Sequence, residues 1–176
     1  SNSKKKIKNK KGIKLNIFAI ANSTKLVINE AGIKENWKTE IATNGEAYSV
    51  QDIIKYAKEN HLENLIAVDN TASSSFVENY VTLIESGFDV VSSNKIANTL
   101  SYGFYKEIRQ VLQDNQKNYL YETNVGAGLP LIDTIKLLHL SEENITKIKG
   151  VFSGTLSYIF NHFSVEDKPF SVVLEE

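Results

Sequence analysis

The stretch NLIAVDNTASSSFVENYVTLIESGFDVVSSNK, residues 64–95, decides the fold. It opens with a short apolar run, 64–70, which is typical of an inner strand of a parallel sheet. A hydroxyl-rich turn follows, and residues 75–87 then predict a helix that Gly87 stops. Residues 88–95 repeat the order of an apolar strand and a polar loop. The stretch therefore predicts a strand–helix–strand unit and an α/β fold.

The flanking sequence continues the alternation of strands and helices, which favours a single α/β arrangement. Strands are expected at 13–23, 118–125 and 144–152. Helices are expected at 49–61, at about 99–116, at 130–139 and at 154–163, with a short helix and loops over 29–48. Ser49 is the expected N-cap of the helix over 49–61.

Polar residues follow three of the predicted strands. They are ANS at 21–23, DNTASSS at 69–75 and SSNK at 92–95. In an open parallel sheet, ligands bind outside the carboxyl ends of the strands, so these turns are candidates for a shared cleft. Ser, Thr, Asn and Asp are also preferred helix N-caps, and capping alone accounts for the turns equally well.

The composition argues against several function classes. A net charge of −1 disfavours binding to nucleic acid or to an anionic membrane surface. The lysine run from Lys4 to Lys11 favours a solvated helix end or chain terminus over a phosphate-binding arm. The absence of cysteine excludes disulfides, Cys-ligated zinc and thiol catalysis. The histidines, His61, His139 and His162, lack the local pairing of a helical zinc site.

Hydropathy and the first residues bear on location and on completeness. No apolar run reaches the length of a membrane span and no signal peptide is visible, so we expect a cytoplasmic protein without a membrane partner. The start SNS, without an initiator methionine, indicates a piece of a longer protein.

A glycine-rich loop, ETNVGAGLP at 122–130, follows one of the predicted strands. It departs from the dinucleotide fingerprint G-x-G-x-x-G because residue 131 is Leu. Glu122 stands at the end of an apolar strand, where an unpartnered buried carboxylate is costly. A hard cation held by Glu122 and by loop carbonyls would satisfy it. A salt bridge or exposure to solvent would also do so, and the sequence alone favours these simpler outcomes.

Two further places carry candidate chemistry. Lys95 follows polar residues at a strand end, where a lysine can polarise a carbonyl or donate a proton, although most lysines are solvated surface residues. Gly154 and Thr155 stand at the start of a predicted helix, which is a ready site for an anion. Helix starts of this kind are more often capped by their own residues.

Taken together, several stretches resemble homoserine dehydrogenase, either free-standing or as a domain of a bifunctional aspartokinase–homoserine dehydrogenase. The resemblance extends from Gly12 to Phe163 and depends on order and spacing, since each stretch alone is a weak signal. The stretches are IANS, VDNTASS, GFDVVSSNKIAN, YETNVGAGLPLIDT and GVFSGTLSYIFN.

This resemblance implies an enzyme of threonine and methionine biosynthesis that reduces L-aspartate 4-semialdehyde to L-homoserine with NADPH or NADH. It implies an incomplete Rossmann-like parallel sheet in residues 1–98, a partial NAD(P)-binding domain. Residues 99–176 would begin an α+β region for substrate binding and dimerisation. The partners implied are a small-molecule substrate, a second copy in a homodimer and, in bifunctional members, a fused aspartokinase domain.

The resemblance also implies cofactor contacts. The turn that lies along the nicotinamide half of the cofactor matches Asn70, Thr71 and Ala72. Lys95 matches a lysine near the cofactor and the reacting carbon. The segment AIANSTK lacks the acidic residue that would bind a ribose 2′-hydroxyl, whereas Ser23 and Lys25 would tolerate a 2′-phosphate. We therefore expect NADP rather than NAD.

Substrate and cation contacts are implied in the same way. Gly154 and Thr155 match positions at the substrate pocket. Glu122 matches the carboxylate of a site for a monovalent cation such as Na⁺. The main-chain carbonyls that complete this site match Val125, Ala127 and Leu129.

Two parts of the family pattern are missing from the sequence. The first strand and its Gly-rich loop should precede Lys4, and a second catalytic lysine should follow Ser171. We therefore expect this 176-residue chain, taken alone, to have little dehydrogenase activity. The alternative to a dehydrogenase is a non-catalytic fragment for oligomerisation or regulation, in which the glycine loop is only structural.

Overall fold

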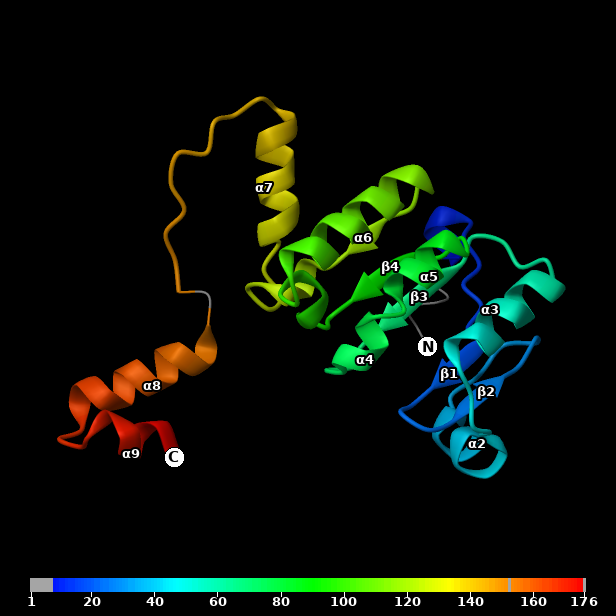
Figure 1. The fold of residues 1–176 in the computed structure, drawn as a ribbon, viewed down its shortest axis with the longest axis horizontal. Coiled ribbons are helices and arrows are strands. Elements are labelled where there is room, and N and C mark those ends of the chain that lie inside the picture. The colour runs from blue at the N-terminus through cyan, green and yellow to red at the C-terminus, as the bar shows by residue number, and fades with distance from the viewer. Residues whose placement is uncertain (1–7, 152, 176) are drawn as a thin grey trace. The chain divides into compact units, whose positions relative to one another are not determined.

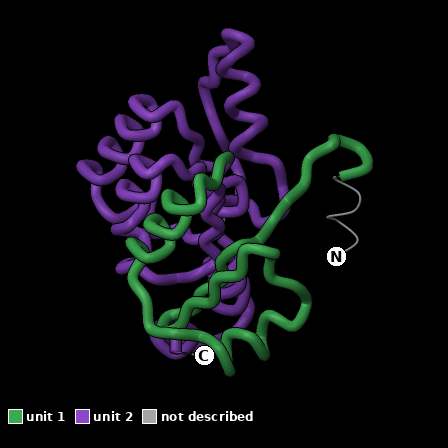
Figure 2. Tube along the Cα trace, turned by 90° about the vertical axis from the view of Figure 1, so that its right-hand side faces the viewer, with its two compact units in different colours: residues 1–63 green, residues 64–176 purple. Residues whose placement is uncertain are grey.

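The computed structural model describes residues 8–151 and 153–175 (Figure 1). The chain separates into two compact units, residues 1–63 and 64–176 (Figure 2). The lysine run begins outside the described residues. Its last part, 8–11, is helical and exposed, as expected of a solvated helix end. This helix stops at Gly12, which adopts a φ of +67° and donates its N–H to the Lys8 carbonyl at 3.0 Å.

The first unit is built on an antiparallel hairpin of β1 (Ala19–Ala21) and β2 (Leu26–Ile28). Helix α2 (Trp37–Asn44) and helix α3 (Val50–Glu59) complete the unit. Its core cluster consists of Val27, Ile33 and Ile41, with Ile20 packed against it. The Ser49 cap is confirmed, because the Ser49 N–H and hydroxyl both donate to Asp52 Oδ2, at 2.6 and 2.8 Å.

The buried strand expected over 13–23 is wrong in length and in setting. Only Ala19–Ala21 is a strand, and it pairs antiparallel with β2 rather than with a parallel sheet. Ile13, Leu15 and Ile17 are 52%, 43% and 42% exposed. Because β2 is three residues long, it offers a short ladder, and the chain before Phe18 has no strand to pair with in the described part of this unit.

The second unit contains the strand–helix–strand arrangement expected from residues 64–95. Strands β3 (Ile66–Asp69), β4 (Asp89–Ser92) and β5 (Tyr119–Leu120) form a parallel sheet in the order β3-β4-β5. The predicted α/β fold is therefore confirmed. Ile66 pairs with Asp89 and Val90 with Tyr119, so the three strands end at the same edge of the sheet.

Three helices of this unit pack against the sheet, its loops or each other. They are α4 (Ser74–Val77), α5 (Tyr80–Glu85) and α6 (Tyr102–Asp114). The core cluster consists of Val77, Tyr80, Ile84, Val90, Ala97, Ile108 and Tyr119, each at most 5% exposed. Burial of this apolar surface at about 25 cal/mol per Å² is the main force that holds these helices to the strands.

The single helix expected over 75–87 is divided into α4 and α5. Asn79 stands between them, and its side-chain Nδ2 donates to the carbonyls of Ser75 and Phe76, both at 3.1 Å. An amide side chain that bonds the preceding turn competes with helical pairing, which accounts for the break. The predicted stop at Gly87 is confirmed by its φ of +92°.

The rest of the chain is mainly helical. Two 3₁₀ turns, η1 (Ile96–Asn98) and η2 (Glu122–Asn124), follow β4 and β5. Three α-helices come after them, namely α7 (Leu131–Leu140), α8 (Gly154–Val165) and α9 (Phe170–Glu175). The strand expected over 144–152 is wrong, because residues 144–151 form no strand and residue 152 lies outside the described residues. Ile148 and Val151 are 58% and 80% exposed, so the alternation there reflects no sheet.

In the part of the chain that the structure describes, none of the helices combines the length and the apolar character needed to cross a bilayer.

Candidate functional site

The candidate site lies at the edge of the sheet where β3, β4 and β5 end. The loop after β3 contains Asn70, Thr71 and Ala72, and all three are exposed. The loop after β4 contains Lys95, and the turn after β5 begins at Glu122. Because the strands are parallel and adjacent, their loops share one edge. The structure thus brings together most of the cofactor and cation residues expected from the sequence.

Asp69 is the last residue of β3 and is 2% exposed. Its Oδ1 accepts the Thr71 N–H at 2.7 Å. Its Oδ2 accepts the Tyr80 hydroxyl at 2.6 Å and the Asn94 amide at 3.1 Å. A carboxylate at this depth is tolerated only with such donors, so Asp69 fixes the backbone of the turn that follows it.

Asn94 is 1% exposed and joins the loop after β4 to the loop after β3. Its Nδ2 donates to Asp69 Oδ2 and to the Ser73 carbonyl, both at 3.1 Å, and lies 3.4 Å from Thr71 Oγ1. Its Oδ1 accepts the Ile96 N–H at 3.1 Å. We call Asp69 and Asn94 the buried pair. Since Lys95 follows Asn94 directly, the pair determines where the Lys95 backbone lies.

Two tyrosines lie beside the buried pair: Tyr80 bonds to Asp69, and Tyr119 packs against Tyr80. The Tyr80 hydroxyl lies 2.6 Å from Asp69 and 2.8 Å from Ser92 Oγ. Burial, followed by the hydrogen bond to Asp69, raises the pKa of Tyr80 far above its ordinary value. Burial also raises the pKa of Tyr119, whose ring meets the Tyr80 ring edge-on at 5.7 Å. At neutral pH both phenols are protonated; the Tyr80 hydroxyl donates to Asp69, whereas the Tyr119 hydroxyl accepts the Asn98 amide at 3.4 Å.

Lys95 is exposed and precedes η1. Its carbonyl accepts the Thr99 hydroxyl at 3.3 Å, which anchors the main chain. This bond does not hold the side chain, so the ammonium group can adopt different rotamers. A lysine with an anchored backbone and a free stem can follow a developing negative charge over a few ångström.

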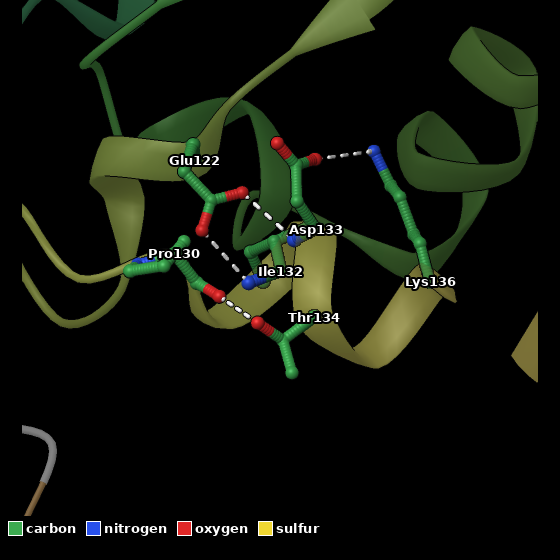
Figure 3. Close-up of polar contacts among 6 residues, drawn as sticks. All are labelled: Glu122, Pro130, Ile132, Asp133, Thr134 and Lys136. Atoms are coloured by element: carbon green, nitrogen blue, oxygen red, sulfur yellow. Dashed lines mark hydrogen bonds and ion pairs between the residues drawn. The ribbon is translucent and has the colours of Figure 1, made fainter. Parts of the chain in front are cut away.

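Glu122 bonds to the first turn of α7, a partner that the sequence did not reveal. Figure 3 shows its Oε1 accepting the Ile132 N–H and its Oε2 accepting the Asp133 N–H, both at 2.9 Å. These N–H groups are among those that a helix leaves without partners at its start. The carboxylate therefore caps α7 and also meets the positive end of the helix dipole.

The glycine loop after Glu122 has a constrained backbone. Gly126 and Ala127 both adopt positive φ, +73° and +52°. A Cβ at position 126 would lie 2.4 Å from Leu131 Cδ1, so a larger residue there would have to displace the Leu131 side chain and adopt a left-handed backbone. The Leu129 carbonyl accepts the Leu131 N–H at 2.9 Å across Pro130, as in an inverse γ-turn.

The expected cation ligands differ in whether their oxygens already accept hydrogen bonds. Within the described residues, the carbonyls of Val125 and Ala127 accept no hydrogen bond, whereas the Leu129 carbonyl accepts one. Both Glu122 oxygens already bond to α7, although each carboxylate oxygen has a second lone pair. Among the described residues no group of three or more His, Cys, Asp or Glu side chains could hold a metal ion. A monovalent-cation site here would depend on carbonyls.

The other predicted site residues belong to segments of the sequence other than the three loops at this edge. Gly154 and Thr155 are exposed at the start of α8, where Ser153 Oγ accepts the Leu156 N–H at 3.2 Å, so the helix is capped by its own residue. Ser23 and Lys25 belong to the first unit, in the turn between β1 and β2. The Lys25 ammonium donates to the Ala42 carbonyl at 3.1 Å.

Sequence reasoning missed the buried pair and Tyr80 as parts of the site. The signal was the acidic and amide residues at the ends of the apolar runs 64–70 and 88–95, where a polar residue must find buried partners. Arg109 of α6 was missed as well. Its guanidinium lies 4.1 Å from the Tyr105 ring centroid and donates to Asn98 Oδ1 at 3.1 Å, which links α6 to the last residue of η1.

Comparison with known families gives consistent matches along the chain. A family model described as "Homoserine dehydrogenase, NAD binding domain" matches residues 2–122. A second, described as "Homoserine dehydrogenase", matches residues 130–176. Together they cover the sheet, the loops after β3 and β4, and helices α7 to α9, while residues 123–129 lie between the two matches.

Individual relatives agree with the family models. The chain is 41% identical over 157 residues to a bifunctional aspartokinase/homoserine dehydrogenase of Buchnera aphidicola, covering 89% of this chain and 19% of that protein. It is 36% identical over 132 residues to a homoserine dehydrogenase of Schizosaccharomyces pombe, covering 75% of this chain and 35% of that protein. The chain thus spans about a fifth to a third of the length of these relatives.

A solved structure matches the fold. It is a hyperthermophilic archaeal homoserine dehydrogenase in complex with NADPH, with a TM-score of 0.72 and 26% identity. The match covers 97% of this chain and 54% of that one.

Proposed function

The chain belongs to the homoserine dehydrogenase family, and from this premise we propose that its protein reduces L-aspartate 4-semialdehyde to L-homoserine with a nicotinamide cofactor. The observation that carries the proposal is the shared edge of β3, β4 and β5. There the exposed turn Asn70–Ala72, Lys95 and Glu122 follow three adjacent strand ends.

The turn Asn70–Ala72, which we call the cofactor turn, fits the nicotinamide half of the cofactor. It is exposed, and its backbone is fixed because the Thr71 N–H is bonded to the buried Asp69 carboxylate. Exposed amide and hydroxyl groups on a fixed turn can bond a carboxamide or a ribose without reorganisation on binding. The cofactor, when bound, supplies the hydride, and the chain supplies orientation.

Lys95 is proposed to stabilise the oxygen of the substrate carbonyl as it gains negative charge. An ammonium group beside an oxyanion lowers the barrier because its charge is already in place. Its position directly after Asn94 ties it to the same buried network as the cofactor turn. Removal of one such charged donor reduces kcat by about 10²–10³.

We propose that the glycine loop holds a monovalent cation through carbonyls, with Val125 and Ala127 as its first ligands. Their unengaged carbonyls and the left-handed backbone at Gly126 and Ala127 support this. Glu122 would contribute charge through its remaining lone pairs while it caps α7. The Leu129 carbonyl would have to bind the cation while it also accepts the Leu131 N–H.

Several further expectations stay proposals. Residues 1–98 are proposed to serve cofactor binding and residues 99–176 substrate binding and dimerisation, with Gly154 and Thr155 near the substrate. NADP is proposed as the preferred cofactor, with Ser23 and Lys25 near its 2′-phosphate. Bifunctional relatives such as the Buchnera protein support fusion to an aspartokinase domain.

The test is an assay of the protein in its full natural length. NADPH oxidation is followed with L-aspartate 4-semialdehyde, and NADP⁺ reduction with L-homoserine. We expect both reactions, and we expect Lys95→Ala to lower kcat by about 10²–10³ while the exposed Lys58→Ala in α3 changes neither kcat nor KM. A protein that binds NADPH but converts neither substrate contradicts the proposed function.

A further inference from the structure

We propose that the buried pair, Asp69 and Asn94, is a positioning unit that holds the cofactor turn and Lys95 in one fixed arrangement. The inference rests on the proposed function, because it concerns the same site. Neither residue reaches the surface, at 2% and 1% exposure, so neither can touch a ligand. Their effect on the reaction must pass through the loops that they hold.

One hydrogen bond between Asn94 and Asp69 links the two loops, with the Asn94 amide as donor and the Asp69 carboxylate as acceptor. The Asp69 carboxylate only accepts hydrogen bonds, so the partner facing Oδ2 has to donate. The Asn94 amide donates to it and, with its second hydrogen, to the Ser73 carbonyl. The bond from the Thr71 N–H to Asp69 Oδ1 holds the middle of the cofactor turn, and the bond to the Ser73 carbonyl holds the residue that follows it.

The pair also reaches the turn that follows the third strand. The Asn94 carbonyl accepts the Asn124 amide at 3.2 Å, and Asn124 is the last residue of η2, the turn that Glu122 opens. The Asn94 N–H donates to Ser92 Oγ at 2.9 Å. One buried residue thus contacts the last residues of β3 and β4 and the 3₁₀ turn after β5.

Energetics favour a positioning role over simple filling of space. An apolar pair of similar volume would pack at this depth without the desolvation cost of a carboxylate. What the polar pair adds is direction, because hydrogen bonds to a buried charge hold their geometry more tightly than apolar contacts do. Loss of one such bond is expected to loosen both loops.

The test uses Asp69→Asn, Asn94→Asp and the double variant that exchanges the two side chains, in the protein of full natural length. Asp69→Asn makes two amides face each other, and Asn94→Asp makes two carboxylates do so within about 3 Å. The exchange restores one donor and one acceptor between positions 69 and 94, but it also places a carboxylate opposite the Ser73 carbonyl, so recovery can only be partial. NADPH affinity is measured by fluorescence titration, and KM, kcat and Tm are measured beside it.

We expect Asp69→Asn to raise KM and Kd for NADPH about tenfold and to lower kcat about tenfold, the size of a lost hydrogen bond to a charge. The exchange variant should regain at least part of both losses. Ile84→Val, a fully buried change in α5, is the matched control and should lower Tm without changing KM or kcat.

Two outcomes overturn the inference. One is an Asp69→Asn variant with NADPH affinity, KM and kcat equal to those of the wild type. The other is a set of variants in which only Tm and the active fraction fall and the exchange recovers nothing. If the wild type binds NADPH but turns over no substrate, the proposed function fails, and the NADPH titration still decides on the positioning role.

Discussion

Replacement of Glu122 tests the capping of α7 directly. Glu122→Ala removes both acceptors, for the Ile132 and Asp133 N–H groups, and also the charge near the helix start. A lost N-cap costs about 1 kcal/mol and a lost charge at the dipole about 0.3–1 kcal/mol, so with two bonds we expect about 2 kcal/mol in total. Glu122→Gln keeps one acceptor oxygen and should lose about 1 kcal/mol.

The assay is urea unfolding combined with amide hydrogen exchange. With a slope of about 2 kcal/mol per molar urea, Glu122→Ala should lower the midpoint by about 1 M. The amides of Ile132 and Asp133 should lose protection before the rest of α7 does. Asp133→Asn is the control on the same helix, because it keeps both Glu122 bonds and loses only a charge near the helix start and an exposed ion pair to Lys136 at 4.0 Å, together worth about 1 kcal/mol or less.

The refuting result is a Glu122→Ala protein with an unchanged urea midpoint and unchanged protection at Ile132 and Asp133. Exchange of Na⁺ for choline separates the cap from the proposed cation site. A carboxylate that serves both roles makes the wild type lose activity without Na⁺ and makes Glu122→Ala insensitive to the exchange. A carboxylate that only caps leaves the response to Na⁺ the same in both proteins.

Three further predictions concern the loop, the tyrosines and the cofactor. Gly126→Ala should lower the free energy of unfolding by about 2 kcal/mol, because its Cβ meets Leu131 and its φ is positive, whereas Gly128→Ala meets nothing and should be close to neutral in thermal unfolding. The pKa of Tyr80 is raised in the folded protein. Its protonated phenol therefore contributes fully to folding stability below the unfolded pKa of about 10, and this contribution is lost as pH rises toward the folded pKa. Tyr80→Phe should therefore weaken the alkaline fall in stability, measured by urea midpoints across pH, and an equal fall in both proteins contradicts this. Lys25→Ala should raise KM for NADPH about fivefold and leave KM for NADH unchanged in steady-state kinetics, while an equal change in both excludes a contact to the 2′-phosphate.

Strands β3 and β4 and the loops that follow them were largely predictable from local sequence. The apolar runs 64–70 and 88–95 are short, end in polar residues and are separated by one helix length, which few folds other than a parallel sheet accommodate. Gly87 was a reliable stop because its φ of +92° is one that glycine adopts readily. The positions of Asn70 and Lys95 at one sheet edge followed from this topology.

The errors occurred where a partner distant in sequence decides the outcome. Residues 13–18 and 144–151 are apolar enough for strands, yet a strand exists only where another offers its hydrogen bonds. Glu122 was expected to meet a cation, a salt bridge or solvent, and it bonds to backbone N–H groups ten and eleven residues ahead. The division at Asn79 depends on a side-chain bond to the preceding turn, which propensities do not resolve.

The location of Trp37 gives the molecule an optical marker. It is the only tryptophan of the chain and begins α2 in the first unit, whereas the tyrosine cluster around Tyr80 lies in the second. Tryptophan emission therefore reports on one unit alone, while the near-ultraviolet circular dichroism of the packed tyrosines reports largely on the other. Coincident transitions of the two signals would mean that the units unfold as one cooperative body, and separated transitions would give each unit its own stability.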